Sequence, residues 1–335
     1  MAVNQKLKVV MIGAGGRANQ VIYPSFSDLH QEGLVDIAGI CDIDPGRLHA
    51  TADAFGIDNR YGDNRYVDEY KKMIEDCKPD AAVVIGQPHI MYDIWVWCLN
   101  QGLHLFIEKP LALTIHQARA LEAVATRNNL VTQVSLQRRY SPMVTQLRTE
   151  ALKRGEITHA VCKFYKSDRS DFLGARDHMM DDTVHAVDTL RWMVGSEVAK
   201  IDSVTRRIGT VDINYIMAQM TFANGAVGHL MNNWSSGKRI FAVEMHAPGI
   251  YIEAEHEIKG YLYADGNLEP IEYDAASCAN NSAFHVSTGV LAAARDFVNA
   301  CLHGGQPMSS FSDAVKTMKV AEIILAQSLL AEELP

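Results

Sequence analysis

The pattern of apolar and polar positions changes part-way along the chain. Up to about residue 137, short apolar runs typical of buried parallel strands alternate with segments of helical spacing. The runs lie at residues 9–12, 35–41, 80–85, 103–107 and 130–135. Farther on, short strands of alternating polarity are separated by turn signals. The pattern predicts an α/β domain over residues 1–137 and an α+β domain over residues 138–335.

A glycine-containing turn follows the first apolar run directly. Residues 13–18 read Gly-Ala-Gly-Gly-Arg-Ala and match the dinucleotide-binding pattern G-x-G-x-x-A. Gly13 allows a tight bend, Gly15 leaves space for a pyrophosphate beside the backbone, and Ala18 lets the next helix pack closely. Amide groups at the start of that helix, around Gly16 and Arg17, would face the anion. The alternative is an ordinary glycine-rich loop of a parallel α/β protein.

The second predicted strand ends at an acidic residue, Asp42. In a dinucleotide-binding domain, a carboxylate at this place meets the hydroxyls of the adenosine ribose. Strand, turn, helix, strand and acid in this order favour dinucleotide binding over the plain loop. An acid here favours NAD, because it would repel the 2′-phosphate of NADP. Arg47, five residues later, leaves NADP possible.

The loop after the strand at residues 80–85 is expected to border the same cofactor. In open parallel sheets, ligands lie outside the carboxyl ends of the strands. Gly86, Gln87 and His89 follow this strand and are candidate cofactor contacts. His89 is explained equally well as a polar residue of an ordinary loop.

A lysine stands at the carboxyl end of the next predicted strand, residues 103–107. Lys109 lies between Glu108 and Pro110. Most lysines are solvated surface groups, but this position would direct the amine toward the place where nicotinamide and substrate meet. We therefore treat Lys109 as a candidate functional residue.

Charge and cysteine content exclude several classes of protein. The formal net charge is −9 with no basic run, which argues against nucleic acid or an anionic membrane surface as the main partner. The six cysteines contain no Cys-x-x-Cys pair, so a zinc cluster and a disulfide framework are not expected. The first strand begins within ten residues of the start and no apolar run is long enough for a membrane span. A cytoplasmic protein is expected.

A predicted helix near residues 178–193 carries regularly spaced polar residues. His178, Asp181, His185 and Asp188 would share one face if the helix begins early enough. A structural polar face, a metal site and an acid/base pair all fit this spacing. No other cluster of histidines and carboxylates completes a metal shell, so no metal is expected.

The segments after this helix predict an antiparallel sheet. Asn224-Gly225 is a hairpin signal between strands at residues 213–222 and 226–234, and Pro248-Gly249 and Asp265-Gly266 mark further turns. One face of the strand at residues 213–222 is apolar, and an open sheet with such a face needs a cover. A second copy of the chain could supply it, so a homodimer or homotetramer is expected. The apolar residues are Ile216, Ala218, Met220 and Phe222.

The chain resembles the glucose-fructose oxidoreductase/inositol dehydrogenase (Gfo/Idh/MocA) family over essentially its whole length. The motifs that carry the resemblance are the turn at 13–18, Glu108-Lys109-Pro110, the segment 137–140 (Gln-Arg-Arg-Tyr) and Asp181-x-x-x-His185. The family combines a Rossmann domain with an open-faced antiparallel sheet domain with flanking helices. The resemblance implies NAD(P)-dependent oxidation or reduction of a sugar, cyclitol or related polyol. It also implies dimers or tetramers that pair through the sheets.

The resemblance also suggests residue roles. Lys109 and His185, with Asp181 orienting the imidazole, would handle the proton of a substrate hydroxyl. Glu108 and Gln137 belong to the shared motifs and are candidate cofactor contacts. The sequence departs from the family pattern at Gly86-Gln87, where Thr-Pro is common, and at Met91, where histidine is common. Additional candidate substrate residues are Tyr165, Trp234 and Arg169, the last in a polar segment at 166–177 that also contains Arg176.

Two other functions are compatible with the sequence. Some family members oxidise a sugar transiently with bound NAD, eliminate a glycosidic bond and return the hydride, so that Tyr165, Tyr215 or the polar segment could serve a redox glycosidase. A non-catalytic dinucleotide-sensing regulator would be expected to have lost Lys109 or His185, and both are present. The sequence does not distinguish among sugars, cyclitols, anhydrosugars and sugar acids as substrates.

Overall fold

The structure is a computed structural model that describes residues 6–62, 68–171 and 177–331. By its internal contacts the chain divides into two units. The first comprises Met1–Ala112, His116–Ser135 and Val290–Val315; the second comprises Leu113–Ile115, Leu136–Gly289 and Lys316–Pro335. Val290–Val315 therefore groups with the first unit, whereas the division expected at residue 137 assigns it to the second domain.

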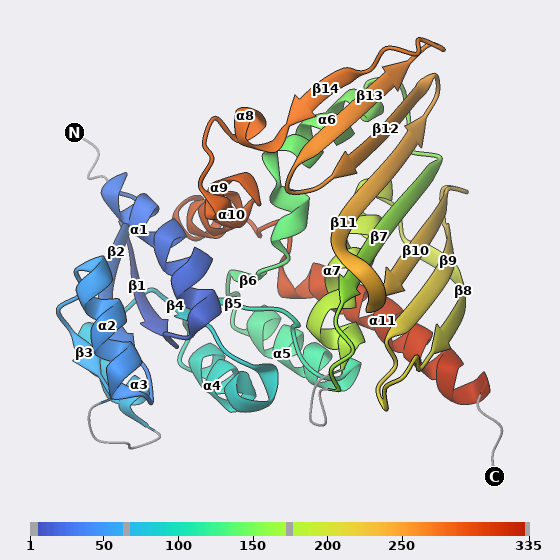
Figure 1. The fold of residues 1–335 in the computed structure, drawn as a ribbon. Helices are drawn as coiled ribbons and strands as arrows, with labels where there is room; N and C mark the ends of the chain where they lie inside the picture. The colour runs from blue at the N-terminus through green and yellow to red at the C-terminus, as the bar shows by residue number, and fades with distance from the viewer. Residues whose placement is uncertain (1–5, 63–67, 172–176, 332–335) are drawn as a thin grey trace. The chain divides into compact units, whose positions relative to one another are not determined.

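The first unit is built on a six-stranded sheet in the order β3-β2-β1-β4-β5-β6, in which all neighbouring strands are parallel (Figure 1). The chain winds outward in opposite directions from β1 and β4, and ligands bind at such a switch point. This arrangement confirms the predicted α/β domain. The strands are β1 Leu7–Ile12, β2 Val35–Cys41, β3 Arg60–Tyr61, β4 Ala81–Val84, β5 His104–Ile107 and β6 Thr132–Val134.

Aromatic residues link the sheet of the first unit to its helices. Phe106 of β5 contacts Phe26 and Phe297 edge to face, at centroid distances of 5.6 and 5.7 Å. Phe297 is fully buried in this core, which explains why its helix groups with the first unit. The helices are the π-helix η1 Ala18–Ile22, α1 Tyr23–Gln31, α2 Pro45–Phe55, α3 Glu69–Cys77, α4 Pro88–Asn100, α5 Ile115–Arg127 and α10 Val290–His303.

The second unit contains an eight-stranded sheet in the order β14-β13-β12-β11-β7-β10-β9-β8 (Figure 1). Its strands pair antiparallel except for β7 with β10. The mostly antiparallel sheet is confirmed, but the edge strand β8 was not expected from the sequence. The strands are β7 His159–Ser167, β8 Val198–Arg206, β9 Tyr215–Phe222, β10 Val227–Asn233, β11 Ser235–Ala247, β12 Ile250–Glu255, β13 Lys259–Ala264 and β14 Ile271–Asp274.

Helices of the second unit cover one face of its sheet. α7 packs on β7 and β10, and α6 packs on β11, β12 and β13. The apolar residues of β9 are buried on this covered face, while Tyr215, Met217 and Thr221 are half-buried. The expectation that a second copy must cover the apolar face is therefore wrong, because the chain covers it itself. The helices are the 3₁₀-helix η2 Gln137–Tyr140, α6 Pro142–Leu152, the π-helix η3 Met179–Thr183, α7 Val184–Val194, α8 Ala275–Ala279, α9 Phe284–Ser287 and α11 Phe311–Ala331.

The structure also bears on the cysteines and on possible membrane-spanning helices. All six cysteines are free thiols, four of them buried. In the part of the chain that the structure describes, we find no helix with both the length and the apolar character needed to cross a membrane.

Candidate functional site

The turn after β1 is so tight that only glycine fits at its first position. Gly13 has a φ of +97°, and a Cβ added there would lie 2.0 Å from the carbonyl oxygen of Ile85. Its N–H donates to the carbonyl oxygen of Cys41 at 2.8 Å. The turn is thereby held against the carboxyl ends of β2 and β4, at the switch point of the sheet.

The next two glycines leave the outer side of the turn open. A Cβ added to Gly15 or Gly16 would meet no atom within 4 Å. The N–H groups of these two residues have no hydrogen-bond partner among the described residues. Ala18 is fully buried, as close packing of the helix requires. Open space beside unpaired amides at a helix start fits the pyrophosphate of a dinucleotide.

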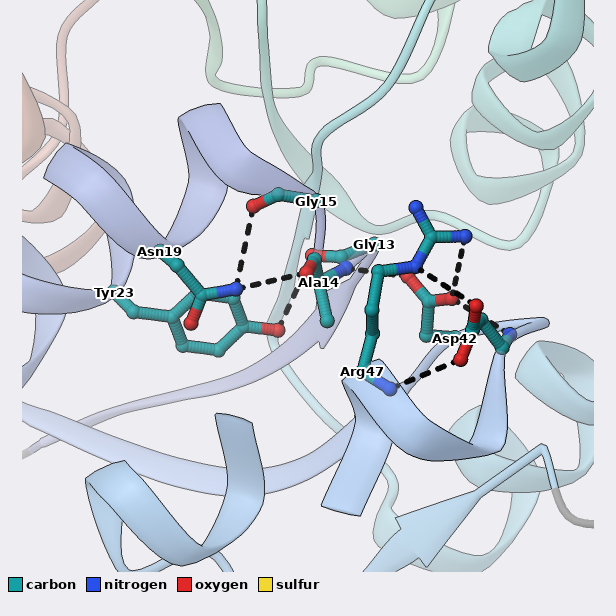
Figure 2. Close-up of polar contacts among 8 residues, drawn as sticks. Gly13, Ala14, Gly15, Asn19, Tyr23, Asp42 and Arg47 are labelled. Carbon is teal, nitrogen blue, oxygen red and sulfur yellow. Dashed lines mark hydrogen bonds and ion pairs between the residues drawn. The ribbon is translucent and has the colours of Figure 1, made fainter. Parts of the chain in front are cut away.

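Asp42 lies beside this turn with both carboxylate oxygens engaged (Figure 2). Oδ2 accepts the N–H of Ala14 at 2.6 Å, and Oδ1 accepts the N–H of Asp44 at 2.8 Å. Nη2 of the half-exposed Arg47 lies 3.8 Å from Oδ1. A carboxylate has about four acceptor positions, so capacity remains for ribose hydroxyls. Asp42 therefore ties residues 13–18, which we call the phosphate turn after its sequence pattern, to the start of α2.

Three residues that sequence reasoning missed support the turn on the side away from the open space at Gly15 and Gly16. Tyr23 donates its hydroxyl to the carbonyl of Gly13 at 3.3 Å, and Asn19 donates its amide to the turn (Figure 2). Thr51 of α2 donates to the side chain of Asn19. Burial, with smaller contributions from Asp42 and Cys41, holds the pKa of Tyr23 well above its usual value, so the phenol stays protonated. The signal available in the sequence was that a polar residue, Asn19, directly follows Ala18.

Lys109 follows β5 at the same edge of the sheet as the phosphate turn. Its side chain is half-buried, and its N–H donates to Oε2 of the buried Glu108 at 3.2 Å. Oε1 of Glu108 lies 3.7 Å from Nε of Arg17 in the helix after the turn. Glu108 therefore links the backbone of Lys109 to the helix that follows the phosphate turn.

The three candidate cofactor contacts in the loop after β4 differ in their packing and exposure. Gly86 is packed against Met91, whose Cε would lie 2.2 Å from a Cβ added to the glycine. Gln87 caps α4 with its carbonyl, which accepts the N–H groups of Ile90 and Met91, and its side chain is exposed. His89 is also exposed. Two positions at which the sequence departs from the family pattern thus pack on each other, because Met91 occupies the space beside Gly86.

In the second unit, the Asp/His helix begins with a wide turn. Residues 179–183 form the π-helix η3, and α7 continues from Val184. Asp181 is half-buried and lies in η3, while His185 is buried in the first turn of α7. Single π-turns occur frequently at functional sites. The expected regular α-helical spacing across 178–188 therefore does not hold over its first part.

The other two polar residues of this helix are engaged within the unit. Asp188 is fully buried and forms a two-point ion pair with Arg139, in which Nε lies 2.8 Å from Oδ2. His178 is buried, and its ring lies against that of Trp234 at a centroid distance of 5.0 Å and an angle of 37°. Burial lowers the pKa of His178, although several nearby carboxylates oppose the shift. Asp188 is therefore a structural anchor of the helix.

The remaining candidate residues differ in accessibility. Tyr165 of β7 is half-buried, and Arg169 is exposed. Trp234 is fully buried between Phe164 and His178, which fits a packing role better than contact with substrate. Gln137 is buried in η2. Arg176 lies outside the described residues, and no group of metal-ligating side chains occurs among the described ones.

Two family models match the chain. The oxidoreductase family model described as an NAD-binding Rossmann fold, GFO_IDH_MocA, matches residues 7–136, and the GFO/IDH/MocA C-terminal domain model matches residues 148–247. The chain belongs to the GFO/IDH/MocA family. This confirms the predicted family, and with it NAD as the cofactor of the first domain.

Several relatives are similar to this GFO/IDH/MocA chain. An inositol 2-dehydrogenase from Salmonella typhimurium is 24% identical over 168 residues, which are 49% of this chain and 48% of that protein. A myo-inositol 2-dehydrogenase from Thermotoga maritima is 24% identical over 267 residues, or 70% and 78% of the two chains. The chain spans about half the length of the first curated relatives it matches.

Solved structures share the fold over nearly the whole chain. A levoglucosan dehydrogenase, solved in complex with NADH and levoglucosan, has a TM-score of 0.82 at 19% identity and covers 98% of both chains. A dehydrogenase from Clostridium difficile has a TM-score of 0.82 at 18% identity, with 96% of this chain and 100% of that chain covered. At these identities the likeness establishes the fold.

Proposed function

We propose that this protein is an NAD-dependent dehydrogenase that transfers a hydride between the nicotinamide and a hydroxyl-bearing carbon of a sugar, cyclitol or related polyol. The observation that carries the proposal is the position of Lys109. The lysine follows β5 at the same carboxyl edge of the parallel sheet as the open phosphate turn and Asp42. An amine beside the cofactor-binding edge is suited to a substrate hydroxyl.

In this proposal His185 accepts the proton of the substrate hydroxyl on a ring nitrogen, and Asp181 orients the imidazole and stabilises its cation. The ammonium group of Lys109 stabilises the negative charge that develops on the same oxygen. NAD, when bound, supplies the acceptor for the hydride that leaves the carbon. The reverse direction reduces a carbonyl group, with His185 returning the proton.

The substrate class is supported by the relatives. Those named above are inositol dehydrogenases, and a protein of the same fold was solved with levoglucosan. All of these substrates carry several hydroxyl groups on a ring. The exposed Arg169 supports testing anionic sugars as well.

A substrate screen tests the reaction class. Polyols, inositols, anhydrosugars and sugar acids are offered with NAD or NADP, and the absorbance of the reduced nicotinamide is followed. We expect net NADH formation with at least one cyclic polyol and a lower kcat/KM with NADP. Release of sugar from a glycoside with no net NADH would instead indicate a redox glycosidase. Binding of NADH without turnover of any compound, in either direction, would contradict the proposal for this panel.

Two variants of Asp42 serve as controls for cofactor choice in the same screen. Asp42→Asn keeps an oxygen acceptor for a backbone N–H but removes the charge that repels a 2′-phosphate. Asp42→Ala removes both. We expect Asp42→Asn to shift the ratio of kcat/KM for NAD to that for NADP by about tenfold toward NADP. An unchanged ratio in both variants would show that Asp42 does not set the preference.

We further propose that the chain forms a homo-oligomer through the face of the eight-stranded sheet opposite α7. This face carries half-buried apolar and aromatic side chains, among them Met217, Met231 and Tyr251. A groove between β8, β9 and β10 on it is lined in part by Val204, Met217 and Met231. Accessible apolar side chains beside polar ones such as Gln219 and His229 are typical of interaction sites.

Light scattering on the purified protein measures the mass in solution. A dimer or tetramer is expected, and Met217→Glu should shift it toward the monomer because a charge would be buried in the interface. Thr210→Glu, in the loop between β8 and β9, is the matched control. A monomeric wild-type protein would contradict this proposal.

A further inference from the structure

Asn19 contacts two successive carbonyl groups of the phosphate turn. Its Nδ2 donates to the carbonyl oxygen of Ala14 at 2.8 Å and to that of Gly15 at 3.2 Å (Figure 2). Its backbone N–H also donates to the carbonyl of Gly15, at 3.0 Å. Both carbonyls therefore point toward Asn19, behind the turn.

The direction of these carbonyls fixes the direction of two amides. In a planar trans peptide, the carbonyl of one residue and the N–H of the next point to opposite sides. The carbonyls of Ala14 and Gly15 face Asn19, so the N–H groups of Gly15 and Gly16 face away from it. Those are the two amides without a partner among the described residues, beside the open space at both glycines.

The side chain of Asn19 is itself oriented by the neighbouring helix. Thr51 of α2 is buried and donates its hydroxyl to Oδ1 of Asn19 at 3.0 Å. This bond places the oxygen toward Thr51 and the NH₂ group toward the turn. An asparagine rotated by half a turn would present its oxygen to the two carbonyls and repel them. α2 begins directly after Asp42 and Asp44, so one helix follows the ribose-binding acid and orients the phosphate turn.

We propose that Asn19, oriented by Thr51, is a positioning residue that sets the two peptide planes of the turn to receive the cofactor pyrophosphate. The inference concerns NAD binding by the first unit and does not depend on the hydride transfer proposed above. Without the side-chain amide of Asn19, the peptide between Ala14 and Gly15 can rotate, whereas the carbonyl of Gly15 keeps only its bond to the backbone N–H of Asn19. The two N–H groups then lose their common direction. Binding of pyrophosphate-containing ligands then weakens, while binding of the base and ribose does not.

The test compares ligands with and without the pyrophosphate. Dissociation constants for NADH and ADP-ribose are measured by calorimetry or fluorescence on the full chain, and adenosine is measured by competition. We expect Asn19→Ala to weaken NADH and ADP-ribose about tenfold and adenosine less than twofold. Asn19→Asp should weaken them more, because its carboxylate cannot donate to the carbonyls and adds a negative charge behind the pyrophosphate.

Thr51 variants separate positioning from general stability. Thr51→Val removes only the hydroxyl and should reproduce part of the loss for ADP-ribose, whereas Thr51→Ser should restore it. Thr51→Val keeps the volume of this buried side chain and Thr51→Ser keeps its hydroxyl, so these variants also give a readout if the Asn19 variants do not fold. Equal losses for adenosine and ADP-ribose, or wild-type ADP-ribose affinity in Asn19→Ala and Thr51→Val, would overturn the proposal. A wild-type protein that binds NADH but oxidises no polyol would contradict the proposed function and leave this inference standing.

Discussion

Replacing Lys109 with methionine is expected to lower kcat for polyol oxidation by about a thousandfold, while the dissociation constant for NADH changes less than threefold. Methionine has a similar length but carries no charge and donates no hydrogen bond. The proposed loss is in stabilisation of the developing oxyanion, which is required in the transition state and not for holding the cofactor. A drop in kcat with nearly constant affinity for NADH is therefore the expected signature.

The controls for this prediction are a second lysine and the second proposed catalytic residue. Lys72→Met changes an exposed lysine of α3 that pairs with Asp76, and it should leave kcat unchanged. His185→Asn should lower kcat by a similar factor, and the double variant Lys109→Met/His185→Asn should lose less than the product of the two factors, because both groups act on one oxygen. Near-normal turnover in the double variant would refute the assigned roles.

Breaking the Arg139–Asp188 pair is expected to cost the largest amount of stability. Both side chains are almost completely buried, and Asp188 also accepts a hydrogen bond from Thr317 at 3.0 Å. Thr317 in turn accepts one from Arg191 at 2.7 Å. Arg139→Leu leaves the carboxylate buried without its cation, which costs about 3–5 kcal/mol. Urea unfolding, followed by circular dichroism, measures the change in the free energy of unfolding.

Two variants distinguish the buried charge from lost packing. Arg139→Leu/Asp188→Leu removes both charges and should recover most of the lost stability, because replacing a buried pair by apolar residues is often nearly neutral. Arg154→Leu breaks an exposed pair with Asp265 and should leave the urea midpoint nearly unchanged, because exposed ion pairs contribute little to stability. If Arg139→Leu unfolds at the wild-type urea concentration, the network does not anchor α7 as we describe.

The conformation of the phosphate turn was predictable because its determinants are local. A buried strand, a glycine that must adopt a positive φ, a helix start and an acid after the next strand all fall between residues 7 and 42. Each is a statement about backbone conformation over a few residues. The end of β5 was predictable for the same reason, since Lys109 follows a short apolar run and precedes a proline.

Other features escaped prediction because they depend on partners far away in the chain. Asp188 has the spacing of a functional residue, and only its contact with Arg139, 49 positions earlier, identifies it as a structural ion pair. In the sequence Asn19 is only a polar residue after Ala18, and its role becomes visible when Thr51, 32 positions later, is found beside it. Trp234 was a candidate for substrate contact, but packing against Phe164 and His178 buries it.

The sequence by itself determined the two kinds of sheet and the conformation of the turn at residues 13–18, because periodicity and turn chemistry are written in neighbouring residues. The family followed from the resemblance carried by the motifs quoted above. The tertiary structure alone decided three further points. These are the packing of α10 in the core of the first unit, the burial of the apolar face of β9 by the chain's own helices, and the contacts of Tyr23, Asn19 and Thr51 that support the phosphate turn. These depend on which distant elements meet, and local patterns of polarity do not encode that pairing.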